Sequence, residues 1–188
     1  MDEIGQLERV VAGLRSTAGR YGAPDGPHPH PRAAELVRPD GVPAPAELRC
    51  WAGFDDRYPW YLAGRRSDQE IASAEGVLLA EPMSVVLQRI VVDSVLEEYA
   101  GVDDVADLDE DDEDVAEQRT YLEELYAEFA ADLPGFGVDL VPGEYPHWIL
   151  WLPPEGAPQV LRYKREAFSK PASFTRYVFG LFSDASDP

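Results

Sequence analysis

Closely spaced carboxylates are the side chains of this sequence with the greatest potential for chemistry. Residues 93–144 contain nineteen Asp and Glu but only one basic residue, Arg119, and so carry −18 of the formal net charge of −20. Carboxylates act as general acids and bases, bind divalent cations and attract basic protein surfaces. So concentrated a negative field favours a basic partner and opposes binding to nucleic acid or to anionic membranes.

One frame of the acidic run can be compared with a calcium-binding loop of the EF-hand type. Such a loop has oxygen ligands at its first, third and fifth positions, Gly at the sixth and Glu at the twelfth. Starting from Asp107, Asp109 and Asp111 match the ligand positions, but Asp112 and Gln118 occupy the two diagnostic ones. We therefore expect no dedicated metal site, while weak and non-specific divalent binding stays compatible with the charge.

The three histidines and the single cysteine show no zinc-binding pattern. His28 and His30 lie in a Pro-rich loop, His147 is far away in the sequence, and Cys50 has no cysteine partner at metal-ligand spacing. We interpret the histidines as exposed loop residues. Cys50 follows the periodicity of a short helix, which is more typical of a small core residue than of a nucleophile.

The sequence nominates no catalytic residue and no cofactor. Ser169 and Ser173 lack the strained elbow of a serine hydrolase, and no Gly-rich segment has the spacing of a phosphate-binding or dinucleotide-binding loop. We therefore expect a protein that is not an enzyme. A hydrolase or a metal-dependent enzyme is the weakest of the hypotheses that the sequence allows.

The C-terminal region has the opposite charge from the acidic run. Its basic residues, which stand against the single acid Glu166, are Arg162, Lys164, Arg165, Lys170 and Arg176. Interleaving with Tyr163 and Phe168 is a pattern of nucleic-acid-binding strips, but the overall charge opposes that function. We interpret the region as an internal counter-patch for the acidic face or as an ordinary solvated face.

These residues must be positioned by helices in the first two thirds of the chain and by strands in the last third. Helical spacing of apolar residues predicts helices over about 4–14, 46–54, 81–99, 117–133 and 174–181, the last of them capped by Ser173. Short apolar runs predict strands at 58–62, 77–79, 138–141, 148–152 and 159–164. Turn residues 153–158 indicate an antiparallel hairpin between the last two strands.

Length and composition favour one domain over residues 1–188. We expect a mobile acidic insertion over 103–116, because self-repulsion and scarce apolar residues oppose a packed structure there, and a frayed tail at 183–188. A lone cysteine and an acidic N-terminus without an apolar run favour an intracellular, cytoplasmic protein without a signal peptide. No apolar run is long enough for a membrane span.

Short motifs in the C-terminal third resemble the end of the SUKH superfamily, the SMI/KNR-like proteins. An apolar strand at Trp148–Leu152 is followed by a strand beginning Gln159-Val160 and by a helix that Ser173-Phe174 introduces. Upstream, Val42-Pro43 is similar to the family's Leu-Pro segment before an early helix. The middle of the chain, from 77 to 99, is similar to the family's strand followed by a helix. The resemblance spans about residues 36–182.

The resemblance implies an α+β fold in which helices flank a mostly antiparallel sheet, here with an acidic insertion. It also implies a non-enzymatic function, because bacterial members are typically immunity proteins that neutralise toxins, many of them nucleases. A nuclease is basic where it binds polyanions, and an acidic protein can occupy such a site. The expected partner is therefore a basic protein of the nuclease-toxin type.

We expect the partner-binding residues to lie in the acidic run and on two aromatic anchors. The acidic candidates are Asp107, Asp109, Asp111, Asp112 and Asp114, and the anchors are Tyr121 and Trp148. The alternative function is a structural or regulatory adaptor in a cellular assembly, in which the acid run serves solubility. The sequence leaves the oligomeric state open.

Overall fold

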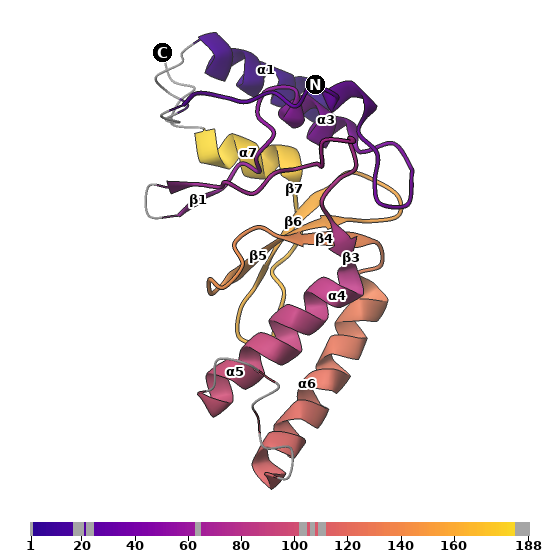
Figure 1. Ribbon diagram of the computed structural model, residues 1–188, viewed down its shortest axis with the longest axis vertical. Coiled ribbons are helices and arrows are strands. Elements are labelled where there is room, and N and C mark those ends of the chain that lie inside the picture. Colours follow the sequence, from indigo (N-terminus) through magenta and orange to yellow (C-terminus); the bar gives the residue numbers. More distant parts are fainter. Residues whose placement is uncertain are drawn as a thin grey trace.

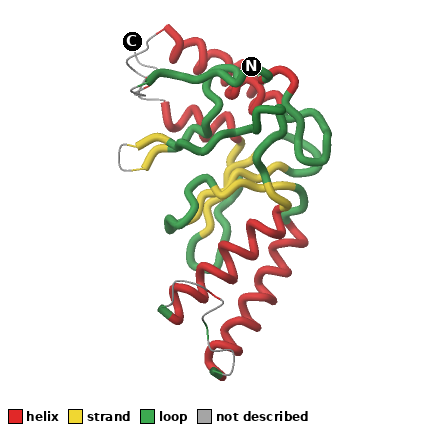
Figure 2. The backbone as a smooth tube through the Cα atoms, viewed as in Figure 1, coloured by secondary structure: helices red, strands yellow, loops and turns green. Residues whose placement is uncertain are grey.

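The protein has an α+β fold in which one antiparallel sheet separates two groups of helices (Figures 1 and 2). The computed structural model describes residues 2–16, 21, 25–62, 65–101, 105, 108 and 112–182. The fold class expected from the sequence is therefore confirmed. Within the described part of the chain, no helix is both long and apolar enough to cross a membrane.

Five strands form the central sheet in the spatial order β3-β4-β5-β6-β7, and every neighbouring pair is antiparallel. The strands are β3 (Glu81–Pro82), β4 (Phe136–Asp139), β5 (His147–Leu152), β6 (Gln159–Tyr163) and β7 (Ala172–Ser173). Side chains alternate between the two faces of a strand, and both faces of β5 and β6 are covered. Leu150 and Val160 enter one core, and Ile149 and Leu161 enter the other.

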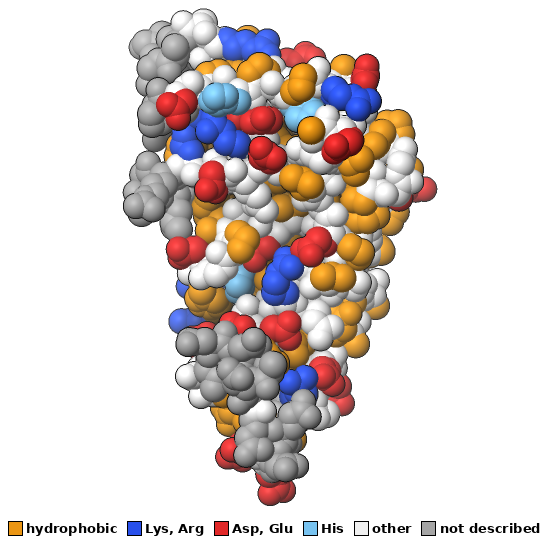
Figure 3. All heavy atoms as spheres, viewed as in Figure 1, with side chains coloured by type: hydrophobic (Ala, Val, Ile, Leu, Met, Phe, Trp, Pro, Cys, Tyr) orange, Lys and Arg blue, Asp and Glu red, His pale blue; other side chains and the backbone are white. Residues whose placement is uncertain are grey.

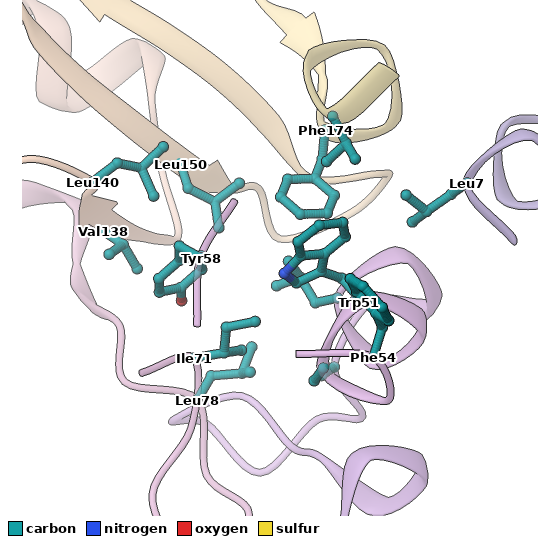
Figure 4. Packing of buried hydrophobic residues seen from close by; sticks show 14 of the residues in the cluster. Leu7, Trp51, Phe54, Tyr58, Ile71, Leu78, Val138, Leu140, Leu150 and Phe174 are labelled. Atoms are coloured by element: carbon teal, nitrogen blue, oxygen red, sulfur yellow. The ribbon is translucent and has the colours of Figure 1, made fainter. Parts of the chain in front are cut away.

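The larger core lies on one face of the sheet. It is covered by α1 (Glu3–Ser16), α3 (Ala46–Ala52) and α7 (Phe174–Phe182), together with the short elements η1 (Ala33–Glu35), β1 (Tyr61–Leu62) and β2 (Arg65–Arg66). Leu7, Trp51 and Phe174 are almost wholly buried and converge there from three different helices (Figure 4). Burial of such large side chains contributes about 1.5–3 kcal/mol each before entropy is counted.

The opposite face of the sheet carries a helical hairpin that extends away from the body (Figure 1). Its first arm joins α4 (Met83–Leu87), the π-helical segment η2 (Gln88–Asp93) and α5 (Ser94–Ala100), and its second arm is α6 (Glu113–Asp132). At the end of η2 the Ser94 hydroxyl donates to the carbonyl of Arg89 at 2.9 Å and adds a second donor to the oxygen that the Ser94 backbone N–H also binds. Gly101, at φ 65°, ends the first arm in a left-handed conformation.

The hairpin has a small core of its own beyond the edge of the sheet. Val92 and Leu96 from the first arm pack with Val115 and Leu122 from α6, and Leu108 joins them from the connection. Because this cluster receives no side chain from the sheet, the outer half of the hairpin depends on contacts between its two arms. The inner half packs on Ile149, Leu161 and Tyr163.

The structure differs from several of the expected elements. Val77 and Leu78 form isolated bridges in place of the buried strand expected at 77–79, and Val77 and Leu79 are exposed. α6 begins at Glu113, earlier than the expected start near 117, because the Asp112 side chain caps it. Residues 113–116 of the expected acidic insertion thus belong to a helix. Positions 103–104, 106–107 and 109–111 of that region and the tail 183–188 lie outside the described residues.

Candidate functional site

The exposed face of α6 is the strongest candidate for a functional surface. Seven carboxylates on this helix are exposed: Glu113, Asp114, Glu117, Glu123, Glu124, Glu128 and Asp132. The opposite face carries Val115 and Leu122 into the hairpin core, and the amphipathic pattern therefore fixes which side faces solvent. A helix of this length extends the surface over about 30 Å. Acidic side chains gather at the narrow end of the molecule, where the hairpin ends (Figure 3).

Few positive charges compensate this face. Among the described residues, the only ion pair on α6 joins Arg119 Nη1 to Glu123 Oε1 at 3.9 Å, a separation too long for a strong interaction. Glu124, Glu128 and Asp132 follow one another at four-residue spacing, which is repulsive on a helix surface. The last turn holds no basic residue, and its acids therefore also oppose the helix dipole. Packing, not surface charge, holds α6 together.

The predicted acidic contact residues are only partly described. Asp107, Asp109 and Asp111 lie outside the described residues. Asp112 is the N-cap of α6, and its Oδ1 accepts the backbone N–H of Asp114 at 3.0 Å. Its carboxylate therefore has a structural role that the charge pattern did not reveal. Asp114 is exposed in the first turn, where its charge favours the helix dipole.

The two predicted aromatic anchors do not share a surface. Tyr121 is 46% exposed in the middle of α6, and its hydroxyl donates to Glu166 Oε2 at 2.9 Å. This hydrogen bond and the charge of Glu166 raise the pKa of Tyr121. Trp148 is half-buried on the other face of the sheet, where its ring centroid lies 5.3 Å from that of Trp60 and 6.1 Å from that of Tyr177. Trp148 is therefore largely occupied within the fold, and Tyr121 stays available.

The turn that Tyr121 contacts is conformationally unusual. Arg165 and Glu166 both have positive φ, at 53° and 60°, and the N–H of Lys164 donates to the carbonyl of Ala167 at 3.0 Å. This is the pattern of a type I′ hairpin turn, in which Asn-Gly is strongly preferred. The left-handed conformation costs non-glycine residues about 1–2 kcal/mol each. Neither Arg165 nor Glu166 is one of the residues that adopt this conformation easily. Contacts from the surrounding structure must therefore stabilise the turn.

Two exposed tyrosines hold this turn from different elements. The Tyr145 hydroxyl accepts the N–H of Arg165 at 2.9 Å, and the Tyr121 hydroxyl binds Glu166 from α6. Tyr145 is 54% exposed, and both rings therefore remain accessible beside the turn. We call the set Tyr121, Tyr145, Lys164, Arg165 and Glu166 the tyrosine–turn surface. Sequence patterns did not single out Tyr145, because no local spacing connects it to residue 165.

The basic residues at 162–176 do not neutralise α6. Within the described chain, no ion pair connects any of them with a carboxylate of that helix, and the guanidinium of Arg162 instead lies over the ring of Trp148 at 5.8 Å. The counter-patch interpretation therefore has no contact to support it. All five of these side chains are exposed, as expected for the solvated alternative.

Two of the three histidines are buried, and the prediction of exposed loop histidines is therefore wrong for them. His30 faces the carbonyl of Ser73 through Nε2 at 3.0 Å, which anchors the Pro-rich loop. His147 Nδ1 lies 3.5 Å from Asp139 Oδ2 within the sheet. His28 is exposed. Loop composition concealed the burial, because only the tertiary fold covers these positions.

The most buried carboxylate among the described residues belongs to a structural network. Asp55 is fully buried. The Arg57 guanidinium donates to it at 2.9 and 3.0 Å and the Arg57 backbone N–H at 3.1 Å, and Tyr21 and Arg66 also contact it. This network ties the segment after α1 to the body of the protein. Within the described chain, no three His, Cys, Asp or Glu side chains are grouped to hold a metal ion.

Cys50 lies on α3, half-buried against the larger core, as the helix periodicity indicated. Burial and the neighbouring charge of Glu8 raise the pKa of its thiol. A raised pKa lowers the thiolate fraction at neutral pH and so reduces nucleophilic reactivity.

Comparison of the chain with protein-family models, with curated proteins and with solved structures found no match. The geometry and charge of the molecule are therefore the basis for assigning its function.

Proposed function

We propose that this protein is a cytoplasmic, non-enzymatic binding module that recognises a basic protein through the exposed face of α6. The single observation behind this proposal is the row of seven exposed carboxylates on that helix, which has one weak ion pair. Protein chains normally interleave both signs of charge on an exposed helix. A one-signed face on a projecting hairpin instead attracts and orients a positively charged partner.

The partner class that fits this surface best is a nuclease-type toxin, and the protein would then be its immunity protein. A nuclease presents cations that bind phosphates at regular spacing, and the carboxylates of α6 can occupy them in place of nucleic acid. This proposal retains the SUKH-like assignment suggested by the motifs of the C-terminal third. The alternative is an adaptor in a cellular assembly whose acidic residues serve solubility.

The first experiment is a pull-down from native lysate at low salt, with a parallel wash at about 0.5 M NaCl, where charge interactions are strongly screened. The test bait is the triple variant Glu117→Lys/Glu124→Lys/Glu128→Lys. The control bait, Glu8→Lys/Asp68→Lys/Glu155→Lys, changes the net charge equally at exposed positions away from α6. We expect wild type and control to retain one basic protein at low salt, and the α6 variant to lose it.

The affinity of the recovered protein should then be measured against each bait by titration calorimetry. Loss of affinity through α6, together with inhibition of a nuclease activity in the partner, is the expected result. Equal affinity of the α6 variant and its control would contradict the assignment of the site. A partner that resists the salt wash and has no toxic activity would favour the adaptor.

A further inference from the structure

We infer that the tyrosine–turn surface and the adjoining face of α6 form a contact between two copies of this chain. The two parts have opposite charge and lie side by side. Lys164 and Arg165 are exposed cations on the turn, and Glu117 and Glu124 are exposed carboxylates that flank Tyr121 at helical spacing. The hydrogen bond from Tyr121 to Glu166 joins the two parts directly.

A twofold interface needs this side-by-side arrangement. In such an interface one patch meets its own copy, and each residue therefore faces a complementary residue elsewhere in the same patch. Rotation about an axis near Tyr121 would bring the turn of one copy onto α6 of the other, and the reverse contact would follow by symmetry.

The chemistry of the patch also suits a protein contact. Tyrosine and arginine are enriched where binding energy concentrates, and Tyr121, Tyr145 and Arg165 lie within one small area. Arg165 and Glu166 stand where the turn geometry favours Asn-Gly. The Glu166 carboxylate accepts the Tyr121 hydroxyl within the chain, whereas the Arg165 side chain is exposed. Contact with a second copy would give the Arg165 guanidinium a carboxylate partner.

The net charge of the chain sets the conditions under which the contact should form. Two molecules that each carry −20 repel one another over about 30 Å at 0.01 M salt, whereas screening shortens this range to about 10 Å at 0.1 M. Attraction between the turn of one copy and α6 of the other acts at a shorter distance than this repulsion and therefore persists at about 0.1 M salt. Self-association should therefore be strongest near about 0.1 M and weaker at both about 0.01 M and about 1 M.

The test uses two charge-reversal variants of the full chain and sedimentation of the purified protein. Variant one is Lys164→Glu/Arg165→Glu and variant two is Glu117→Lys/Glu124→Lys. Each variant places like charges at both halves of a symmetric contact, and we expect each to weaken the dimer at least about tenfold. An equimolar mixture restores opposite charges at both halves and should recover the dimer as a heterodimer.

A turn replacement, Arg165→Asn/Glu166→Gly, separates this contact from folding. It supplies the preferred turn residues, and we expect a raised melting temperature together with weakened self-association. Wild-type protein that stays monomeric at about 200 μM in all three salts would overturn the inference. The inference would also be overturned if the mixture failed to form the heterodimer, or if the turn replacement left association unchanged.

The contact would cover Glu117 and Glu124, which the proposed function assigns to the basic partner, and the two contacts would therefore compete for one face of α6. Self-association is measured on the purified chain alone, and the two proposals can therefore fail separately. A dimer that forms while no basic protein is captured would support the contact and count against the proposed function. Capture of a basic partner by a strictly monomeric chain would do the reverse.

Discussion

Tyr163 shows at the scale of one residue how burial controls the response to pH. Its hydroxyl is buried and has no hydrogen-bond partner among the described residues, and burial together with the charge of Glu166 raises its pKa to about 12. In the unfolded chain a tyrosine loses its proton near pH 10. Between about pH 10 and 12 the unfolded state is therefore the one that binds fewer protons, and stability falls as the pH rises.

Tyr163→Phe should increase the free energy of unfolding by about 1 kcal/mol at pH 7, because it removes a buried hydroxyl for which the described part of the chain supplies no partner. It should also reduce the loss of stability between pH 10 and 12. Urea unfolding at pH 7 and at pH 11 measures both effects. The control is Tyr61→Phe, since the Tyr61 hydroxyl donates to the carbonyl of Tyr21 at 3.0 Å. That variant should lose about 1 kcal/mol at pH 7.

At the scale of an element, α6 carries its charges unfavourably at one end and favourably at the other. Asp132 lies in the last turn, where the helix dipole is negative, and follows Glu128 at four-residue spacing. Asp132→Lys should therefore raise the free energy of unfolding by about 1 kcal/mol. Thermal and urea unfolding monitored by circular dichroism would measure the gain.

The same substitution at the other end of α6 provides the matched control. Asp114 lies in the first turn, and its backbone N–H is already held by Asp112. Asp114→Lys should lower stability by about 0.5 kcal/mol although it changes the net charge by the same amount. A gain in both variants would show that total charge, and not position along the helix, decides stability.

At the scale of the whole molecule, the separation of charge makes stability depend on salt. A stretch that carries −18 repels itself most strongly in the compact state. The free energy of unfolding in urea should therefore rise between about 0.02 M and about 0.3 M NaCl. The variant Glu117→Lys/Glu124→Lys/Glu128→Lys should show a smaller rise. A decrease with salt would mean that attractive pairs outweigh this repulsion.

Periodicity predicted where the helices lie in the sequence more reliably than it predicted which parts of the fold they pack against. Leu7, Leu48 and Leu87 belong to the apolar stripes of three predicted helices and are fully buried in the structure, because an amphipathic helix must face its apolar stripe inward wherever it docks. The π-helical turn at Gln88–Asp93 has no such signal, and its widened geometry depends on what surrounds it. The same limit applies to His30, whose burial depends on residue 73.

The sequence by itself determined the charge of the candidate surface and the side of α6 that faces solvent. Both are local properties, since they follow from residue type and from spacing along one helix. Only the tertiary structure decided that Trp148 is occupied by Trp60 and Tyr177 while Tyr121 stays accessible beside Glu166. Those contacts join residues 29 to 88 positions apart, and no pattern within a single element encodes them.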